Sequence, residues 1–193
     1  MTEKGSGKAF AVGAPLIAVM VLGLFSVSYF ISTILGFPFS LNLPLAVELV
    51  GGAIAVTGFA VIAWTFSNRS PATVIVSTYI TLTKALKRIP AAEKAGRTEP
   101  LIVSGPQKYT RNPLYFGVVV MVLGWAILTA TTFVFVATVV ILLWFTAVII
   151  PLEEGELRAL FGDEWIKYSR ETPMLVPFTK RRRHDSSEPE QGR

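Results

Sequence analysis

The sequence lacks cysteine altogether and contains a single histidine in 193 residues. Without cysteine there are no disulfides, thiolate metal sites or cysteine nucleophiles. The one histidine belongs to Lys180-Arg-Arg-Arg-His184, a polar C-terminal run in which we expect a tail residue rather than a catalyst. The sequence shows no P-loop, dinucleotide glycine fingerprint, metal-ligand cluster or Ser/His/Asp arrangement, so soluble NAD-binding folds and metal sites are not expected.

Charge is also scarce: 16% of residues are charged and 52% are hydrophobic, against about 25% and roughly 45–50% in soluble domains. A helix needs about 20 apolar residues to cross a bilayer. Residues 10–35 and 43–66 each meet this requirement, and the uncharged stretch 114–150 is long enough for two helices joined by a turn at 129–132. The sequence therefore predicts an all-α integral membrane protein with about four transmembrane helices.

The first apolar stretch follows Lys4 and Lys8, as a signal peptide would. It exceeds the usual signal core of about 7–15 residues and precedes no clear cleavage site, so we expect it to remain as a helix. Lys and Arg are frequent in residues 67–112 and near both termini, but absent from the link 36–42 and the hairpin tip. The positive-inside rule then places both termini and residues 67–112 in the cytoplasm.

The short chain suggests a prokaryotic plasma membrane, and we attribute the net charge of +5 to its topology and to membrane lipids rather than to nucleic acid. We divide the chain into residues 1–98, with two spans and a cytoplasmic connection, a core of 99–178, and a disordered basic-then-acidic tail of 179–193. Residues 72–83 are apolar but too short to cross; they continue the second span, insert halfway or lie at the interface.

Residues 99–113 contain three prolines and Gly105, which favours an extended, turn-rich cytoplasmic loop. Pro113 can start the third span, because a proline in the first turn loses no helical hydrogen bond. After Pro151 the pattern predicts a short amphipathic helix, with a break at Gly162. One face of this helix collects Glu154, Leu157, Phe161, Trp165 and Tyr168, whereas Glu156, Arg158, Asp163 and Lys167 point mostly elsewhere.

Glu154 is unusual because a carboxylate in an apolar stripe needs a partner or a bound cation. The alternative is that it lies beyond the membrane boundary and is hydrated. The motif Arg111-Asn-Pro-Leu-Tyr-Phe-Gly117 also has a structural interpretation when taken alone: a phosphate-anchoring arginine, an interfacial tyrosine and a packing glycine. Gly51, Gly52 and Gly58 in the second span are expected to be helix-packing contacts.

Two motifs, which follow one another along the chain, resemble those of a known protein family. They are Ser104-Gly-Pro-Gln-Lys-Tyr-Thr-Arg-Asn-Pro-Leu-Tyr-Phe-Gly117 and, after a hydrophobic hairpin, Glu153-Glu-Gly-Glu-Leu-Arg-Ala-Leu-Phe-Gly-Asp-Glu-Trp-Ile-Lys-Tyr168. Together they resemble the isoprenylcysteine carboxyl methyltransferase family, which is related to the phospholipid N-methyltransferases. The resemblance covers residues 99–178, about two-fifths of the chain. Two positions depart from the family pattern: Asn112 replaces a frequent histidine, and Met174 stands where an arginine is common.

The resemblance implies an S-adenosylmethionine-dependent enzyme that methylates a lipophilic acceptor at the cytoplasmic membrane face, most like isoprenylcysteine carboxyl O-methylation. The acceptor stays open among prenylcysteine-like compounds, phospholipids and isoprenoids, and Met174 makes prenylcysteine less secure. Arg111 and Glu154 are the implied catalytic residues. The implied cofactor-binding residues are Tyr109, Arg111, Asn112, Pro113, Leu114, Tyr115, Gly117, Glu153 and Glu154. The rival hypotheses are an NADPH-dependent membrane enone or sterol reductase and a non-enzymatic scaffold subunit.

Overall fold

A computed structural model describes residues 3–68, 70–72, 74–76, 79 and 101–179. Within these residues the regular structure is helical, with one isolated bridge between Ser40 and Thr131 and no strand. The elements are α1 (Glu3–Ile34), α2 (Leu45–Asn68), the 3-10 helix η1 (Gly105–Lys108), α4 (Pro113–Thr129), α5 (Thr132–Trp144), the π-helical η2 (Phe145–Ile149), α6 (Ile150–Phe161) and α7 (Asp163–Glu171).

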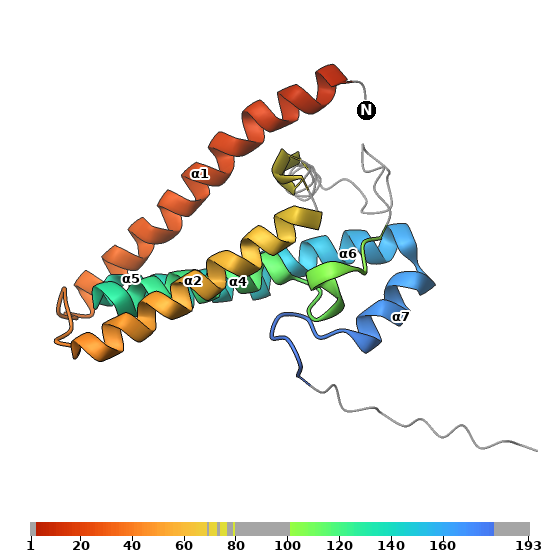
Figure 1. Ribbon diagram of the computed structural model, residues 1–193. Helices are drawn as coiled ribbons and strands as arrows, with labels where there is room; N and C mark the ends of the chain where they lie inside the picture. Colours follow the sequence, from red (N-terminus) through yellow and green to blue (C-terminus); the bar gives the residue numbers. More distant parts are fainter. Residues whose placement is uncertain (1–2, 69, 73, 77–78, 80–100, 180–193) are drawn as a thin grey trace, which may run out of the picture.

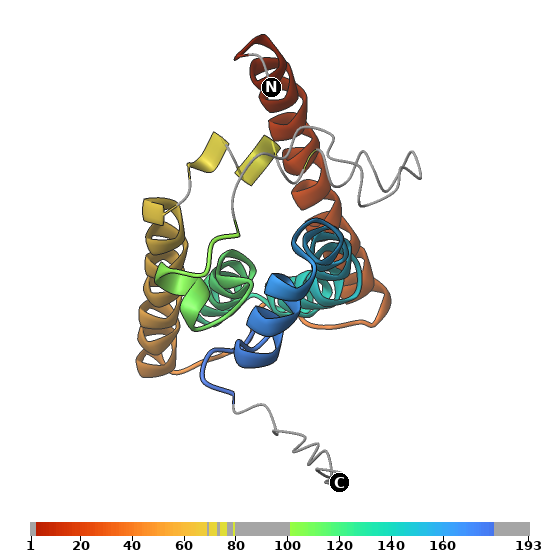
Figure 2. The same cartoon turned by 90° about the vertical axis from the view of Figure 1, so that its right-hand side faces the viewer.

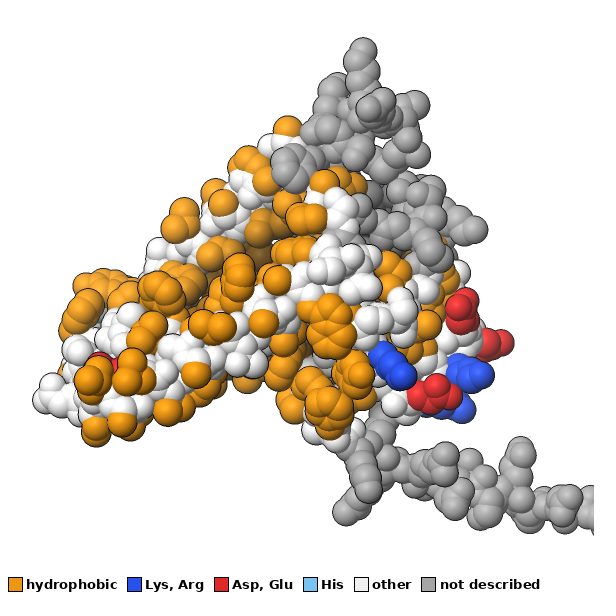
Figure 3. All heavy atoms as spheres, in the orientation of Figure 1, with side chains coloured by type: hydrophobic (Ala, Val, Ile, Leu, Met, Phe, Trp, Pro, Cys, Tyr) orange, Lys and Arg blue, Asp and Glu red, His pale blue; other side chains and the backbone are white. Residues whose placement is uncertain are grey.

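Three of the described helices are long and apolar enough to cross a membrane: Ala11–Ile34, Leu45–Asn68 and Thr132–Phe161. The apolar helix α4 has 17 residues, which at about 1.5 Å per residue cover roughly 25 Å of a core about 30 Å thick. Apolar side chains spread over the surface of the spans, whereas charged side chains gather mostly at the end where α7 lies (Figure 3). The predicted all-helical class is thus confirmed, and the count of four spans stays a prediction.

The long helices form a single layer with the contact order α2, α4, α5 and α1. Figure 2 looks nearly along α4 and α5, whereas α1 and α2 are inclined in this view. The tightest contact joins α2 to α4 and is made by glycines that face the partner helix: Gly51, Gly58, Gly117 and Gly124. A methyl group at Gly58 would collide with the backbone of Met121. Gly52 differs, because its methyl group would sit 3.5 Å from Leu128 Cδ1, an ordinary contact. The predicted close-packing role is confirmed for Gly51 and Gly58.

The predicted hairpin between the last two apolar stretches is confirmed. Helix α4 begins at Pro113 and ends at Thr129, Ala130 adopts a left-handed conformation with φ 48°, and α5 begins at Thr132. The turn is tied to the connection between α1 and α2, where Leu41 N donates to Ala130 O at 2.7 Å. The four-residue polar run therefore reverses the chain at one end of the layer (Figure 1).

The helix that follows the hairpin runs past Pro151 without interruption, through η2 into α6. In η2 the Ile150 N–H bonds to Phe145 O, five residues back. Proline has no N–H and crowds the carbonyl four residues before it, and a wider π turn accommodates both effects. The predicted amphipathic helix is therefore in place but is not separate from the preceding span. It ends at Gly162, where φ is 52° and α7 starts a new direction, so the predicted break is confirmed.

Some predictions concern residues outside the described part of the chain. These are most of the predicted cytoplasmic connection that precedes residue 99, including most of 72–83, and the tail from 180 onward. Residues 71–72, 74–76 and 79 are helical. The loop preceding α4 has no helix at 101–104, then turns at Gly105, where φ is 63°, into the short η1. This agrees with the turn-rich path predicted from its prolines.

Candidate functional site

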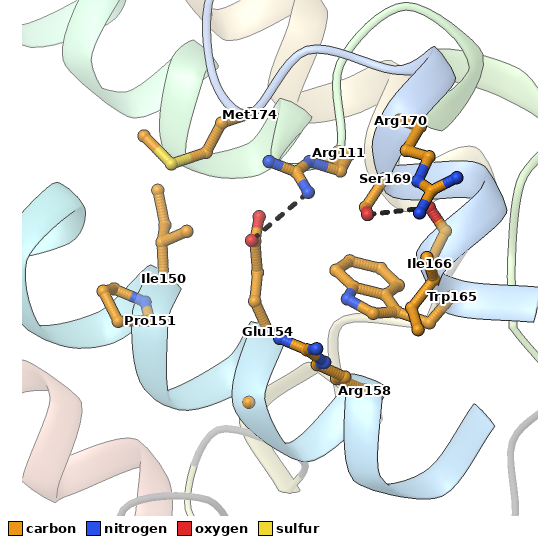
Figure 4. Close-up of a pocket in the computed structure, with 11 residues that line it drawn as sticks. Arg111, Ile150, Pro151, Glu154, Arg158, Trp165, Ile166, Ser169, Arg170 and Met174 are labelled. Carbon is orange, nitrogen blue, oxygen red and sulfur yellow. Dashed lines mark hydrogen bonds and ion pairs between the residues drawn. The ribbon is translucent and has the colours of Figure 1, made fainter. Parts of the chain in front are cut away.

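The loop before α4, helices α6 and α7, and the chain after α7 surround one cavity of about 470 Å³ (Figure 4). Its volume lies in the range of about 300–1,000 Å³ that small-molecule sites occupy. The lining residues are Arg111, Ile150, Pro151, Glu154, Gly155, Arg158, Trp165, Ile166, Ser169, Arg170 and Met174. In Figure 4, one side of the cavity is formed by Ile150, Pro151 and Met174, and the opposite side by the α7 residues Trp165, Ile166, Ser169 and Arg170.

An ion pair crosses the cavity from the loop before α4 to α6. Arg111 Nη1 lies 3.3 Å from Glu154 Oε2, and the two side chains are only 7% and 20% exposed. Asn112 Nδ2 donates to the other carboxylate oxygen at 3.3 Å. The Arg111 guanidinium carbon also lies 5.7 Å from the centre of the Trp165 ring. Glu154 therefore has the partner that its place in the apolar stripe required, and two charges are held at the cavity wall.

The loop that carries Arg111 is fixed by the chain after α7. Arg111 N donates to Pro173 O at 2.9 Å, and Asn112 Nδ2 donates to Met174 O at 2.9 Å. Thr110 Oγ1 adds a bond to Leu175 O at 2.8 Å. Three consecutive carbonyls thus hold three consecutive residues, so the position of Arg111 depends on a segment more than sixty residues away.

Tyr115 connects α4 to α6 beside the cavity. Its hydroxyl donates to Glu153 Oε1 at 2.8 Å, and its ring packs on Phe145 with centroids 4.6 Å apart. Phe145 opens the π turn, so the contact holds α4 against the place where the long helix widens. Because Glu153 precedes Glu154, this bond also limits the rotation of α6 that would withdraw Glu154 from Arg111.

Tyr168 connects α7 to the loop before α4. Its hydroxyl donates to Gln107 O at 2.7 Å, which ties α7 to η1. Burial raises the pKa of Tyr168 to about 12, an effect that Arg111 opposes and Glu154 reinforces. The phenol is therefore neutral near pH 7 and serves as a hydrogen-bond donor, not as a base.

The structure gathers part of the predicted site. Arg111 and Glu154 line the cavity, and Asn112 touches Glu154. Glu153 and Tyr115 bond to each other just behind the lining. The remaining predicted residues, Tyr109, Pro113, Leu114 and Gly117, are not among the lining residues.

Two of those residues face elsewhere for clear reasons. The Tyr109 ring lies between Trp64 and Phe178, at centroid distances of 5.9 and 5.4 Å. Gly117 faces α2, where an added Cβ would sit 2.8 Å from Ile62 Cγ1. Tyr109 therefore contributes to a surface cluster and Gly117 to helix packing.

Several lining residues were not predicted from the sequence. Arg158, placed off the apolar face, lines the cavity because it lies about one helical turn after Glu154 on α6. Ser169 lies one helical turn after Trp165, so a longer projection of the same face would have found it. Arg170 had no such signal. Among the described residues, no group of three or more His, Cys, Asp or Glu side chains could hold a metal ion.

Known proteins match part of the chain. Methanethiol S-methyltransferase 1 of Bradyrhizobium diazoefficiens is 36% identical over 73 residues, which are 38% of this chain and 25% of that protein. Methanethiol S-methyltransferase of Crocosphaera subtropica is 37% identical over 71 residues, or 37% of this chain and 27% of that one. Protein-S-isoprenylcysteine O-methyltransferase B of Arabidopsis thaliana is 30% identical over 78 residues, 40% of each chain. The matched stretch thus spans less than half of each relative's length, and no solved structure matches the chain.

The model of one protein family, phospholipid methyltransferase, matches residues 49–164. This range exceeds half of the chain and runs from α2 through the hairpin to the start of α7. It includes the Arg111 loop, Tyr115 and both glutamates, whereas Trp165, Ser169, Arg170 and Met174 lie beyond it. The chain therefore belongs to the phospholipid methyltransferase family of membrane methyltransferases.

Proposed function

We propose that this protein is an S-adenosylmethionine-dependent methyltransferase that modifies a lipophilic acceptor at the cytoplasmic face of a membrane. The observation that carries the proposal is the cavity at the end of the apolar helices, with the Arg111–Glu154 pair on its wall. Family membership supports methyl transfer as the reaction. The position of the cavity, at the end of the apolar helices, supports a site that both a water-soluble donor and a membrane-borne acceptor can enter.

The lining residues fit the chemistry of S-adenosylmethionine, which has a carboxylate, an ammonium, a sulfonium and an aromatic base. Glu154 offers a carboxylate to the cationic groups, and Arg111, Arg158 and Arg170 offer guanidinium groups to the carboxylate. The Trp165 indole, whose ring faces the Arg111 guanidinium, offers an apolar edge to the base. When bound, this cofactor supplies a methyl group activated by the positive sulfur.

The residues of the chain then have to orient the reactants and keep water out. Arg111 and Asn112 already hold both oxygens of Glu154, so its carboxylate is oriented before a ligand arrives. Trp165 is 4% exposed and stands against the Arg111 guanidinium, which limits the access of water from that side. A carboxylate acceptor needs no general base, whereas a thiol or amine acceptor must lose a proton, and Glu154 is the carboxylate that lines the cavity.

The acceptor is proposed to approach from the bilayer side of the cavity. The apolar side of the cavity is formed by Ile150, Pro151 and Met174 (Figure 4). Ile150 and Pro151 directly follow η2, close to the ends of the spans. We include α4 as a fourth span, which places the cavity and both termini on the positively charged, cytoplasmic side. The names of the relatives suggest two acceptor types, a small thiol and the carboxylate of a prenylcysteine; a phospholipid or isoprenoid acceptor stays possible within the family.

Calorimetry with S-adenosylhomocysteine on the detergent-solubilised full chain tests the donor site. We expect saturable one-to-one binding, together with thermal protection by S-adenosylhomocysteine and none by NADPH. Protection by NADPH alone would favour a reductase, and no binding to well-folded protein would contradict the proposal. Incubation with methyl-labelled donor and either an alkanethiol or a farnesylcysteine derivative then identifies the acceptor class by the labelled product.

A further inference from the structure

An exposed apolar surface lies outside the cavity, on the far side of the Arg111 loop. We call it the aromatic rim; it consists of Trp64, Tyr109, Val176 and Phe178. These side chains are 46%, 39%, 53% and 81% exposed. The Tyr109 ring contacts both Trp64 and Phe178, so the rim is continuous from α2 to the chain after α7. In Figure 3, apolar side chains are grouped at the surface near the end of the described chain.

The position and chemistry of the aromatic rim match the boundary of a bilayer. Trp64 lies one turn before the end of α2, a helix long and apolar enough to cross the membrane, so the rim continues the lipid-facing side of that helix. Aromatic side chains concentrate at this level of membrane proteins. The sequence places Lys180-Arg-Arg-Arg183 directly after Thr179, the last described residue. Four cations that follow the rim in the sequence are complementary to anionic phospholipid headgroups.

The segment that carries Val176 and Phe178 is also the segment that holds the cavity loop. Its carbonyls at Pro173, Met174 and Leu175 accept hydrogen bonds from the residues 110–112. The first rim residue, Val176, follows the last of these carbonyls directly. Tyr109 in the rim directly precedes Thr110. The two segments that form this contact, residues 110–112 and 173–175, are therefore each joined covalently to a rim residue. A change in the position of the rim thus reaches Arg111 through the neighbouring residues and the hydrogen bonds between the two segments.

We propose that the aromatic rim docks on an anionic lipid surface and that this docking orders the Arg111 loop through residues 173–175. The protein would then keep its Arg111–Glu154 pair assembled best in a membrane rich in anionic headgroups. This inference concerns how the membrane controls the cavity and does not depend on which reaction the cavity performs. The bound partner is the bilayer surface itself, because the rim is continuous with a membrane-facing helix.

Hydrogen exchange on the full chain in lipid nanodiscs tests the proposal. One preparation contains phosphatidylcholine alone, and the other contains equal amounts of phosphatidylcholine and phosphatidylglycerol. The readout is exchange at the Arg111 amide, which donates to Pro173 O. We expect exchange to be slower by about fivefold or more in the anionic nanodiscs, the effect of one or more cations engaging the surface.

Two variants and one control locate the effect. Phe178→Ser removes the most exposed rim residue, and the combined change of residues 180–183 to Gln removes the cations; each should abolish most of the difference between lipids. Phe39→Ser is the matched control, because Phe39 is 69% exposed but lies in the connection between α1 and α2, at the opposite end of the layer (Figure 1). It should retain the full difference.

Equal exchange in the two lipids, or a lipid effect that survives the charge change, would overturn the proposal. Should Phe178→Ser fail to fold, the charge variant decides alone, because it leaves the described residues intact. S-adenosylhomocysteine binding is measured on the same samples. A lipid effect without such binding would count against the proposed function and in favour of the docking surface, so the two failures are distinguishable.

Discussion

The contact between α2 and α4 and the cavity beside the loop before α4 are held together by opposite means. Along the helices, glycines bring one backbone against the other, and hydroxyls such as Thr57 and Thr65 bond to carbonyls of their own helix. At the cavity, side chains and loop carbonyls from distant segments bond to one another, and Arg111 meets Glu154 at 3.3 Å. Close backbone packing therefore stabilises the α2–α4 contact, whereas hydrogen bonds and an ion pair stabilise the cavity region.

The difference follows from the two surroundings. In hydrocarbon, apolar helices gain no hydrophobic advantage from meeting, so close approach through small residues provides the attraction. At the boundary with water, a buried charge is tolerated when it has an opposite charge and hydrogen-bond partners. We therefore expect the α2–α4 contact to be sensitive to volume and insensitive to pH, and the cavity to be sensitive to charge and proton state.

Glu154→Gln should have the largest effect, and the effect should fall on ligand binding. The change keeps the shape but removes the negative charge that faces Arg111 and, as proposed, the cationic part of the donor. Losing one partner of a partly buried charge pair costs about 2–5 kcal/mol, so S-adenosylhomocysteine should bind roughly a hundredfold more weakly by calorimetry.

The matched control is Glu164→Gln, an exposed carboxylate on α7 that does not line the cavity. It should bind S-adenosylhomocysteine with unchanged affinity. Unchanged affinity in Glu154→Gln as well would remove Glu154 from the donor site and return it to a purely structural ion pair.

Alkaline pH should weaken the cavity region through Tyr168. Because folding raises the pKa of Tyr168 from 10.0 to about 12, its contribution is complete below pH 10 and is lost as the pH rises toward 12. A pKa shift of two units corresponds to about 2–3 kcal/mol of unfolding free energy. Thermal melts in detergent between pH 8 and 12 should show this decline.

Tyr168→Phe separates this contribution from general alkaline damage. At pH 8 the variant should be slightly less stable, because it lacks the bond to Gln107 O, worth about 1 kcal/mol. Above pH 10 its stability should fall less steeply than that of the unchanged protein. Parallel pH curves for the two proteins would contradict the assignment.

Gly58→Ala should disturb the α2–α4 contact, and Gly52→Ala should not. The new methyl group at position 58 meets the backbone of Met121, whereas the one at 52 meets a movable Leu128 side chain at 3.5 Å. Overpacking costs about 1–3 kcal/mol, and the better helix propensity of alanine returns up to about 1 kcal/mol. Gly58→Ala should therefore lose about 1–2 kcal/mol in thermal or denaturant unfolding.

Gly52→Ala tests volume on the same helix with the same substitution, and it should be neutral or slightly stabilising. Neither glycine variant should change the pH profile below pH 10, because the atoms nearest to both glycines belong to residues that do not titrate. Equal stabilisation by both changes would show that helix propensity decides their effect, and equal destabilisation would contradict the difference in packing between the two positions.

The sequence predicts those features that depend on neighbours along the chain. Pro113 starts α4, the polar run at 129–132 turns the hairpin, and Gly162 ends α6, because each is a local backbone preference. The helical period also brought Glu154 and Trp165 to one face, and both line the cavity. Local patterns therefore predicted the boundaries of the elements and one wall of the candidate site.

Other features depend on contacts that leave no pattern. The carbonyls of residues 173–175 hold the Arg111 loop through backbone atoms, which carry no residue-specific signal. Tyr109 and Arg111 lie two residues apart outside a helix, and tertiary contacts send one ring to the surface and the other side chain into the cavity. The passage of the helix through Pro151 requires a π turn, whose wider geometry is set by packing around Phe145.

The smallest expected effect comes from Tyr115→Phe, which probes the junction between the two regions. The ring keeps its contact with Phe145, but the hydroxyl bond to Glu153 at 2.8 Å is lost. One hydrogen bond to a charged group contributes about 1.5–3 kcal/mol at most and less where water replaces it, so we expect about 1 kcal/mol in stability. If Tyr115 positions α6, S-adenosylhomocysteine affinity should fall by about fivefold, as that energy implies, while Tyr115→Leu, which also removes the ring, should lose more stability. A loss of affinity as large as that of Glu154→Gln would instead place the Tyr115 hydroxyl in direct contact with the ligand.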